Sequence, residues 1–322
     1  MLGKNKLKKK WRKGKSVKDA AISSSSNDDT KFLNDTLANS INSYTVDRSL
    51  MPDWYHPHPY IQSGYRRITN SFRGCFLSLF YIHNELGNIY SHLVGVFLYC
   101  FLFPTVSYWL PYPNTTPFEY LLFYLFCFGS LTCFLTSTLF HLCGCHSKSV
   151  FIICSKADFT GIIFGQVGGL IPTIYYAFYC DWKFQFLYIT LILFFASLTL
   201  KVTTSTKFVG PNYRNLRTML LMGLGLSSVV PITHHILEYG IDMAYQTISL
   251  KFIIYSTVSL LIGVVIFITH IPECFFPNKF DIIGHSHQFW HLFVLLGTTI
   301  HYFGYIEQYH YWHLHHPTCA VN

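Results

Sequence analysis

Seven stretches of mostly apolar residues, each close to the length of a membrane-spanning helix, constrain this chain more than any other feature. A helix needs about 20 consecutive apolar residues to cross the hydrocarbon core of a bilayer. Of the 322 residues, 51% are hydrophobic and only 12% are charged, whereas soluble domains carry about 25% charged residues. The stretches lie at Ile89–Leu110, Phe118–Cys143, Cys154–Phe178, Phe184–Thr203, Leu216–Tyr239, Leu250–His270 and Ser286–Ile306. The sequence therefore predicts an all-α integral membrane protein with seven transmembrane helices.

The regions around the apolar stretches differ in composition. We divide the chain into four parts, residues 1–50, 51–88, 89–306 and 307–322. The first part is basic and then Ser/Asn-rich, which is typical of a disordered tail, and it lacks the apolar core of a cleaved signal. The second contains the aromatic and proline-containing run Trp54–Tyr60 and predicts a membrane-apposed segment with a short helix around Tyr65–Phe80. The third is the membrane domain, and the fourth is a His-rich outer tail.

The distribution of Lys and Arg predicts the orientation of the bundle, because cytoplasmic loops of membrane proteins are enriched in both residues. With the N-terminus inside, ten Lys/Arg residues fall on inner connections, and only Lys183 and Lys251 fall on outer ones. We therefore expect a cytoplasmic N-terminus and an outer C-terminus, in the endoplasmic reticulum or the plasma membrane. Cys180 and Cys319 would both lie outside, which leaves a disulfide between them open.

Four ionisable residues, His141, Asp158, His287 and His291, lie within the apolar stretches at what this orientation makes the cytoplasmic edge. Such groups are costly inside a membrane and are usually functional. His287 and His291 are four residues apart, so they share one helix face about 6 Å apart. Three imidazoles with a nearby carboxylate suit a catalytic zinc site with one position open to water. The sequence predicts Zn²⁺ bound by His141, His287 and His291, with Ser137 one turn deeper than His141.

Other interpretations of these residues remain open. A single membrane histidine more often makes a helix-packing hydrogen bond, and His270 and His285 fit that role. A local thiolate cluster would use His141, Cys143, Cys145 and His146. Four ligands within six residues at a helix end rarely point to one spot, which disfavours it. His234, His235 and His301 near the outer helix ends form a conceivable second site.

Several motifs resemble those of the progestin and adipoQ receptor family, which includes the adiponectin receptors and the hemolysin III-like proteins. These motifs are Ser137–His141, Cys145–Ser147, Ser155–Gly161 and Ser286–His291, with further similarity at His83–Glu85, Gly223–Ser227 and Ile271–Asp281. The resemblance runs in order from about Leu50 to Phe303, so it excludes the basic tail and the His-rich end. The fungal zinc-homeostasis members look most similar.

This resemblance implies a seven-helix bundle with a cytoplasmic N-terminus. It implies zinc held by the three histidines named above, with Asp158 holding a water, and it implies a superfamily that contains alkaline ceramidases. Glu85 and His92 also match family positions, and we expect them to support the ligands rather than bind the metal.

Three functions follow from these features. The first is a zinc-dependent hydrolase of a lipid amide such as ceramide, linked to lipid signalling and zinc homeostasis. In it, Asp158 would accept the proton of water and Ser137 would help to hold the oxyanion. The second is a receptor for an unknown outer ligand with a purely structural zinc. The third is a zinc transporter, which would place its substrate near the bilayer midplane, where no comparable cluster occurs. We expect no nucleic-acid partner.

Overall fold

A computed structural model describes residues 44–208 and 213–315 of the chain. From Thr45 onward these residues belong to one compact unit. Most of the predicted basic tail lies outside the described residues, as does the end of the chain beyond His315.

The described chain is almost entirely helical. Its longer helices are α3 (Leu86–Leu102), α5 (Pro117–Cys143), α6 (Lys148–Ala177), α7 (Trp182–Thr204), α8 (Arg214–Leu226), α9 (Val229–Tyr239), α11 (Leu250–Thr269) and α12 (Ser286–His315). The shorter elements are α2 (Phe72–Leu77), α4 (Val106–Trp109), α10 (Ile241–Thr247), η1 (Arg48–Leu50), η2 (Asp53–Tyr55), η3 (Ser78–Phe80) and η4 (Thr206–Phe208). Strands β1 (Thr45–Val46) and β2 (Tyr65–Arg66) pair antiparallel, with Thr45 opposite Arg66.

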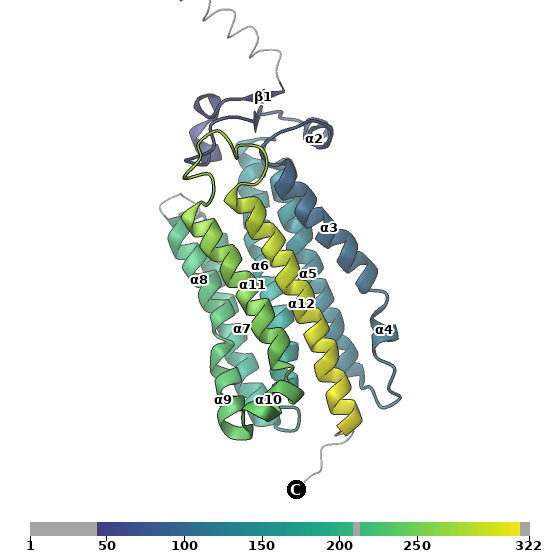
Figure 1. The fold of residues 1–322 in the computed structure, drawn as a ribbon. Coiled ribbons are helices and arrows are strands. Elements are labelled where there is room, and N and C mark those ends of the chain that lie inside the picture. Colours follow the sequence, from purple (N-terminus) through teal and green to yellow (C-terminus); the bar gives the residue numbers. More distant parts are fainter. Residues whose placement is uncertain (1–43, 209–212, 316–322) are drawn as a thin grey trace, which may run out of the picture. The chain divides into compact units, whose positions relative to one another are not determined.

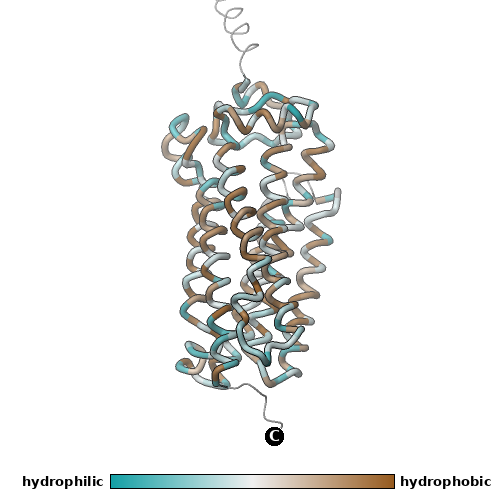
Figure 2. Tube along the Cα trace, turned by 90° about the vertical axis from the view of Figure 1, so that its right-hand side faces the viewer, coloured by the Kyte–Doolittle hydropathy of each residue, from teal (hydrophilic) through white to brown (hydrophobic). Residues whose placement is uncertain are grey.

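Five helices in the described part of the chain are long and apolar enough to cross a membrane. They are α5, α6, α7, α11 and the combined segment Asn215–Tyr239, which spans α8 and α9. Helix α3 is apolar but shorter. Large Phe, Leu and Ile side chains face outward along these helices, as a lipid-facing surface requires. Figure 2 shows the same pattern, with hydrophobic residues along the helices and hydrophilic ones gathered towards the two ends.

The helix bounds differ from the predicted stretches at four places. The helix of the third stretch, α6, begins at Lys148 rather than Cys154. The first stretch ends early at Leu102 and continues as α4, because Pro104 has no backbone N–H to donate. The fifth divides at Ser227 and Ser228, whose hydroxyls donate to carbonyl oxygens one turn back, to Leu224 O at 2.6 Å and to Gly225 O at 2.9 Å. The seventh runs past Ile306 to His315.

The helices lie side by side, and the connections gather at the two ends of the bundle (Figure 1). The segment that contains β1 and α2 lies at the same end as the connection between α11 and α12, and α9 and α10 meet at the other end. The helices α5 and α6 pack closely through glycines. A Cβ atom on Gly161 would come within 2.1 Å of Thr136 Oγ1, and one on Gly129 within 2.5 Å of Phe164 O. This close approach fixes the side chains of α5 and α6 relative to one another.

A buried polar group ties α5 to the far end of α12. Helix α5 begins with a capping box, in which Thr116 and Glu119 satisfy each other's backbone N–H groups. The carboxylate of Glu119, which is fully buried, also accepts a hydrogen bond from Tyr176 at 3.1 Å. His313 Nε2 lies 2.8 Å from the same oxygen, Glu119 Oε1. The last turn of α12 is therefore anchored to the first turn of α5.

Candidate metal centre

Three histidines from two helices converge at the end of the bundle that carries β1 and α2. His141 lies in the last turn of α5, and His287 and His291 lie in the first turns of α12. One ring nitrogen of each lies within 4.8 Å of the others, and His141 Nε2 lies 3.3 Å from His287 Nε2. His141 and His291 are buried. Two ligands of a tetrahedral zinc ion, each about 2.0–2.1 Å from the metal, lie about 3.3 Å apart. The three side chains can therefore hold a metal ion.

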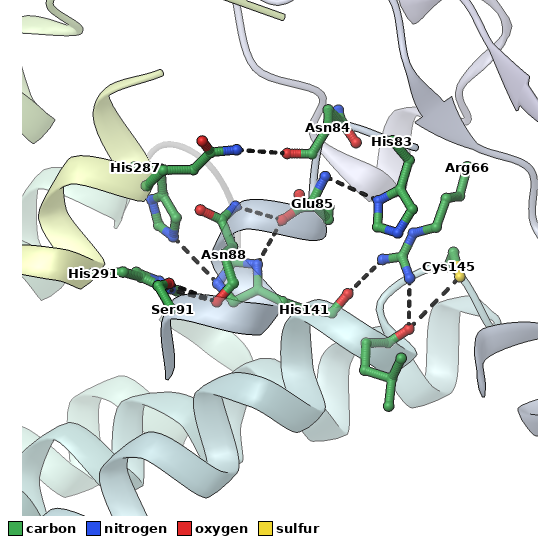
Figure 3. A network of polar contacts seen from close by, with 12 residues as sticks. Arg66, His83, Asn84, Glu85, Asn88, Ser91, His141, Cys145, His287 and His291 are labelled. Atoms are coloured by element: carbon green, nitrogen blue, oxygen red, sulfur yellow. Dashed lines mark hydrogen bonds and ion pairs between the residues drawn. The ribbon is translucent and has the colours of Figure 1, made fainter. Parts of the chain in front are cut away.

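The ring of His141 is oriented by Glu85, the residue that precedes α3. His141 Nδ1 donates to Glu85 Oε2 at 2.6 Å, and Asn88 Nδ2 donates to the same oxygen at 2.6 Å (Figure 3). With Nδ1 protonated and donating, the lone pair of Nε2 faces the other histidines. A carboxylate behind a histidine ligand is the usual arrangement in zinc sites, since it fixes the tautomer and raises the basicity of the ring.

His291 is oriented by groups on α3. Its Nδ1 donates to the Asn88 carbonyl oxygen at 3.0 Å and lies 3.2 Å from Ser91 Oγ. The ring of His92 stacks on that of His291, with centroids 3.6 Å apart and planes at 13°. Nε2 of His291 is therefore available to bind a metal ion, as is Nε2 of His141.

A buried arginine holds the helix end that carries His141. Arg66 in β2 donates to Ser78 Oγ at 2.8 Å, to Leu142 O at 2.9 Å and to His141 O. These carbonyls belong to the last turn of α5 and have no partner within the helix. Burial and the nearby Arg66 lower the pKa of His83 to about 3, so His83 stays neutral beside the guanidinium.

Electrostatics also favour an ionised Glu85. Burial raises the pKa of this carboxyl, but His141 and the hydrogen bonds from His141 and Asn88 outweigh burial and hold the pKa well below its usual value. The carboxylate is thus an acceptor at neutral pH. It places a negative charge next to His141, on the side of the ring that faces away from His287.

Asp158 and Ser137 lie beside the histidines rather than among them. Asp158 projects from α6 and Ser137 from α5, one turn before His141. Asp158 is not one of the groups that meet within 4.8 Å. Both residues line the same cavity as the histidines, a hollow of about 1240 Å³. The cavity continues between α6, α8, α9 and α11 as far as Thr173 and His301, and most of its lining is apolar.

The structure distributes the other candidate histidines and thiols differently. Cys145 Sγ lies 3.7 Å from Cys75 Sγ, in a separate cluster that also contains Cys143, and His146 Nδ1 lies 3.0 Å from Ser147 Oγ. The thiols are therefore gathered around Cys75 rather than around His141. His285 Nε2 donates to Asn84 O at 3.0 Å, which is a packing contact of the predicted kind.

The outer histidines each have a separate partner. His234 Nδ1 lies 2.9 Å from the Tyr188 hydroxyl, and His301 Nε2 lies 2.8 Å from Thr173 Oγ1. His235 bonds Ala177 O and Thr247 Oγ1. These three residues do not form a metal-binding group in the described part of the chain. Cys180 is in a disulfide, and Cys319 lies outside the described residues.

Sequence reasoning missed Arg66, Asn88 and Ser91. The signal for the last two was present, because Glu85, Asn88, Ser91 and His92 recur at three- and four-residue spacing and so share one face of a helix. Arg66 carried no such signal, since two of its three partners are backbone carbonyls of a distant helix.

Residues 80–302 match the model of the haemolysin-III related family. The chain is 33% identical over 260 residues to an adiponectin receptor protein of Drosophila melanogaster, covering 80% of this chain and 58% of the relative. It is 33% identical to the ADIPOR-like receptor IZH1 of Eremothecium gossypii, over 80% of this chain and 82% of the relative. It is 31% identical to the ADIPOR-like receptor IZH2 of Saccharomyces cerevisiae, over 82% of this chain and 84% of the relative. The chain therefore spans less than two thirds of the fly protein but most of the fungal ones.

The chain belongs to the haemolysin-III related family, which the adiponectin receptors share. This confirms the resemblance seen in the motifs, including the similarity to fungal members. Together with its long apolar helices, this makes the protein a multi-pass integral membrane protein.

Proposed function

We propose that this protein is a zinc-dependent hydrolase that cleaves the amide bond of a ceramide-like lipid at the cytoplasmic edge of its membrane. The observation that carries the proposal is that three imidazole nitrogens meet in the wall of a large apolar cavity, beside Asp158 and Ser137. Three nitrogen ligands that leave one position open are typical of catalytic rather than structural zinc. The cavity suits an acyl chain, and the polar groups at one end suit the amide.

The proposed topology has seven crossings, with the N-terminus in the cytoplasm. The crossings are α3, α5, α6, α7, α8 with α9, α11 and α12. Helix α12 has 30 residues and is about 45 Å long at 1.5 Å per residue, which exceeds the ~30 Å hydrocarbon core. The Lys/Arg bias supports the cytoplasmic assignment of the end that holds His141. The membrane would be that of the endoplasmic reticulum or the cell surface.

In this proposal the three histidines hold the ion, and Glu85 and the Asn88 carbonyl keep His141 and His291 in the binding tautomer. Bound zinc polarises a carbonyl and lowers the pKa of water towards ~7. Asp158 accepts a proton from the water that adds to the amide carbon and returns it to the leaving nitrogen. Ser137 steadies Asp158 by its hydroxyl and can donate to the oxyanion. The carbon–nitrogen bond then breaks, giving a fatty acid and an amine.

A receptor with structural zinc is the second candidate, and the names of the similar proteins, adiponectin receptor and ADIPOR-like receptor, favour it. The two roles are compatible if a ligand at one end of the bundle alters lipid turnover at the other. Such coupling would connect lipid signalling with zinc homeostasis.

The test is release of fatty acid from a panel of ceramides by the zinc-loaded protein in lipid. The parent should release fatty acid, and Asp158→Asn should lose about 10²–10⁴-fold in rate while retaining zinc, because an amide cannot accept the proton. A parent that cleaves none of the ceramides, or activity that survives Asp158→Asn or zinc removal, would leave the receptor role as the function.

A further inference from the structure

A second group of metal-ligand side chains lies outside the site described above. His58 belongs to the loop between η2 and β2, His270 follows the last residue of α11, and Glu273 lies in the connection between α11 and α12. One ring nitrogen of each histidine and one carboxylate oxygen all lie within 4.8 Å of one another. This group shares no residue with the first.

The separations between its atoms suit a single small cation. His58 Nε2 lies 3.1 Å from His270 Nδ1 and 3.6 Å from Glu273 Oε1. These distances bracket the about 3.3 Å expected between two ligands of tetrahedral zinc. The contact at 3.1 Å also fits a direct N–H···N hydrogen bond, but the carboxylate oxygen at 3.6 Å is beyond hydrogen-bond range. Two imidazoles and a carboxylate favour zinc over calcium or magnesium, which prefer oxygen ligands throughout.

Glu273 presents a buried carboxyl group to the two histidines. Its side chain is 1% exposed, and its ion-pair partner among the described residues is His58, which carries a positive charge only when protonated. The backbone N–H of Ser286 donates to Oε2 at 2.8 Å, and the Ser286 hydroxyl donates to Oε1. These bonds orient the carboxylate without neutralising it. A metal ion held between this carboxyl group and the two imidazoles would offset the cost of burying it.

The ring of His270 packs against two aromatic rings of the segment Trp54–Tyr60. His270 ends α11 as its C-cap, with φ 56° in the left-handed region where helices commonly terminate. Its ring meets that of His58 edge to face, with centroids 4.7 Å apart, and lies 5.6 Å from the ring of Tyr60. The His58 side chain is 23% exposed, so an ion has access.

We propose that His58, His270 and Glu273 form a second zinc site, which clamps the segment Trp54–Tyr60 to the connection between α11 and α12. His58 also lines the cavity that contains His287, so the ion secures part of the cavity wall. Glu273 holds Ser286, the residue before His287. Two direct connections thereby link the second ion to the first site. The proposal does not depend on the hydrolase activity.

The first test is the zinc content of the full-length protein in lipid nanodiscs after equilibrium dialysis against excess Zn²⁺. The parent should bind two ions per chain, and His58→Gln should bind one. The double variant His287→Ala/His291→Ala should also bind one, so the two losses are separable. His56→Gln is the matched control, since this exposed histidine lies two residues from His58 but outside the group, and it should keep two.

The second test is amide hydrogen exchange of Trp54–Tyr60 with and without zinc. Exchange should slow with zinc in the parent and in His287→Ala/His291→Ala, but not in His58→Gln. Parent protein that saturates at one ion, or His58→Gln that binds as much zinc as the parent, overturns the second site. A third outcome also contradicts the second site: amide exchange of Trp54–Tyr60 in the parent could be slow without zinc and remain unchanged when zinc is added. The 3.1 Å contact between His58 and His270 would then be a direct hydrogen bond. His58 lies in a loop and anchors no helix, so its variant should fold.

Discussion

Glu85 Oε2 lies 2.6 Å from His141 Nδ1, so a carboxylate ahead of α3 determines which nitrogen at the end of α5 faces the metal site. The two residues lie 56 positions apart in the chain. Their contact couples the position of α3 to the chemistry of α5, and it provides a direct test of the site.

Glu85→Gln should weaken zinc binding by about 10–100-fold. The neutral amide lacks the negative charge with which the carboxylate stabilises the His141 tautomer protonated at Nδ1. Competition with a chelator of known affinity measures this change. Glu238→Gln alters an exposed carboxylate on α9 and serves as the control. Equal zinc affinity in Glu85→Gln and the parent would show that the ion pair does not support a metal ligand.

His141→Ala, His287→Ala and His291→Ala should each lower bound zinc by about one equivalent per chain, because each removes one of three ligands. Elemental analysis of purified protein measures the loss. Asp158→Ala should keep most of the metal, since Asp158 lies outside the ligand group. His146→Ala changes a histidine that bonds Ser147 instead and should have no effect. Unchanged zinc in the His287→Ala/His291→Ala double variant would rule out the site.

Gly161→Ala should destabilise the bundle by about 1–3 kcal/mol, because the added methyl group would overlap Thr136 and force α5 and α6 apart. The same shift separates Asp158 from His141. Gly223→Ala is the matched control, because a Cβ atom there meets nothing within 4 Å. Thermal unfolding in detergent compares the two variants. Equal stability of both would contradict the close packing of α5 on α6.

A tag placed before Met1 should be accessible from the cytosol, and a tag placed after Asn322 only from the opposite side of the membrane. Protease protection in sealed vesicles distinguishes the two. Tags on the same side would mean an even number of crossings. The charge bias of the loops would then no longer assign His141 to the cytoplasmic edge.

The length of the apolar stretches predicted the helices well because membrane spans are set by length and apolarity, and α7 and α11 agree with their predicted stretches to within two residues at each end. Local chemistry that the length and apolarity of a stretch do not reveal, such as Pro104 and the paired Ser227 and Ser228, accompanies two of the departures.

The convergence of His141 with His287 and His291 followed from spacing and orientation along the helices. The contacts of Glu85, Arg66 and His58 could not be predicted from helix spacing or orientation. Each joins a loop or strand to a distant element, and no sequence period specifies how such segments pack. Loop conformation also brings His270 to His58. His270 itself adopts a left-handed backbone conformation, which the sequence does not predict.

Helix α12 has a mechanical consequence. It carries His287 and His291 in its first turns and His313 in its last, where His313 bonds the buried Glu119. Because these residues belong to one uninterrupted rod, any turn or slide of the end at His313 displaces the imidazoles at the other end. An event at one end of the bundle can therefore move the imidazoles at the other end, without any diffusing messenger.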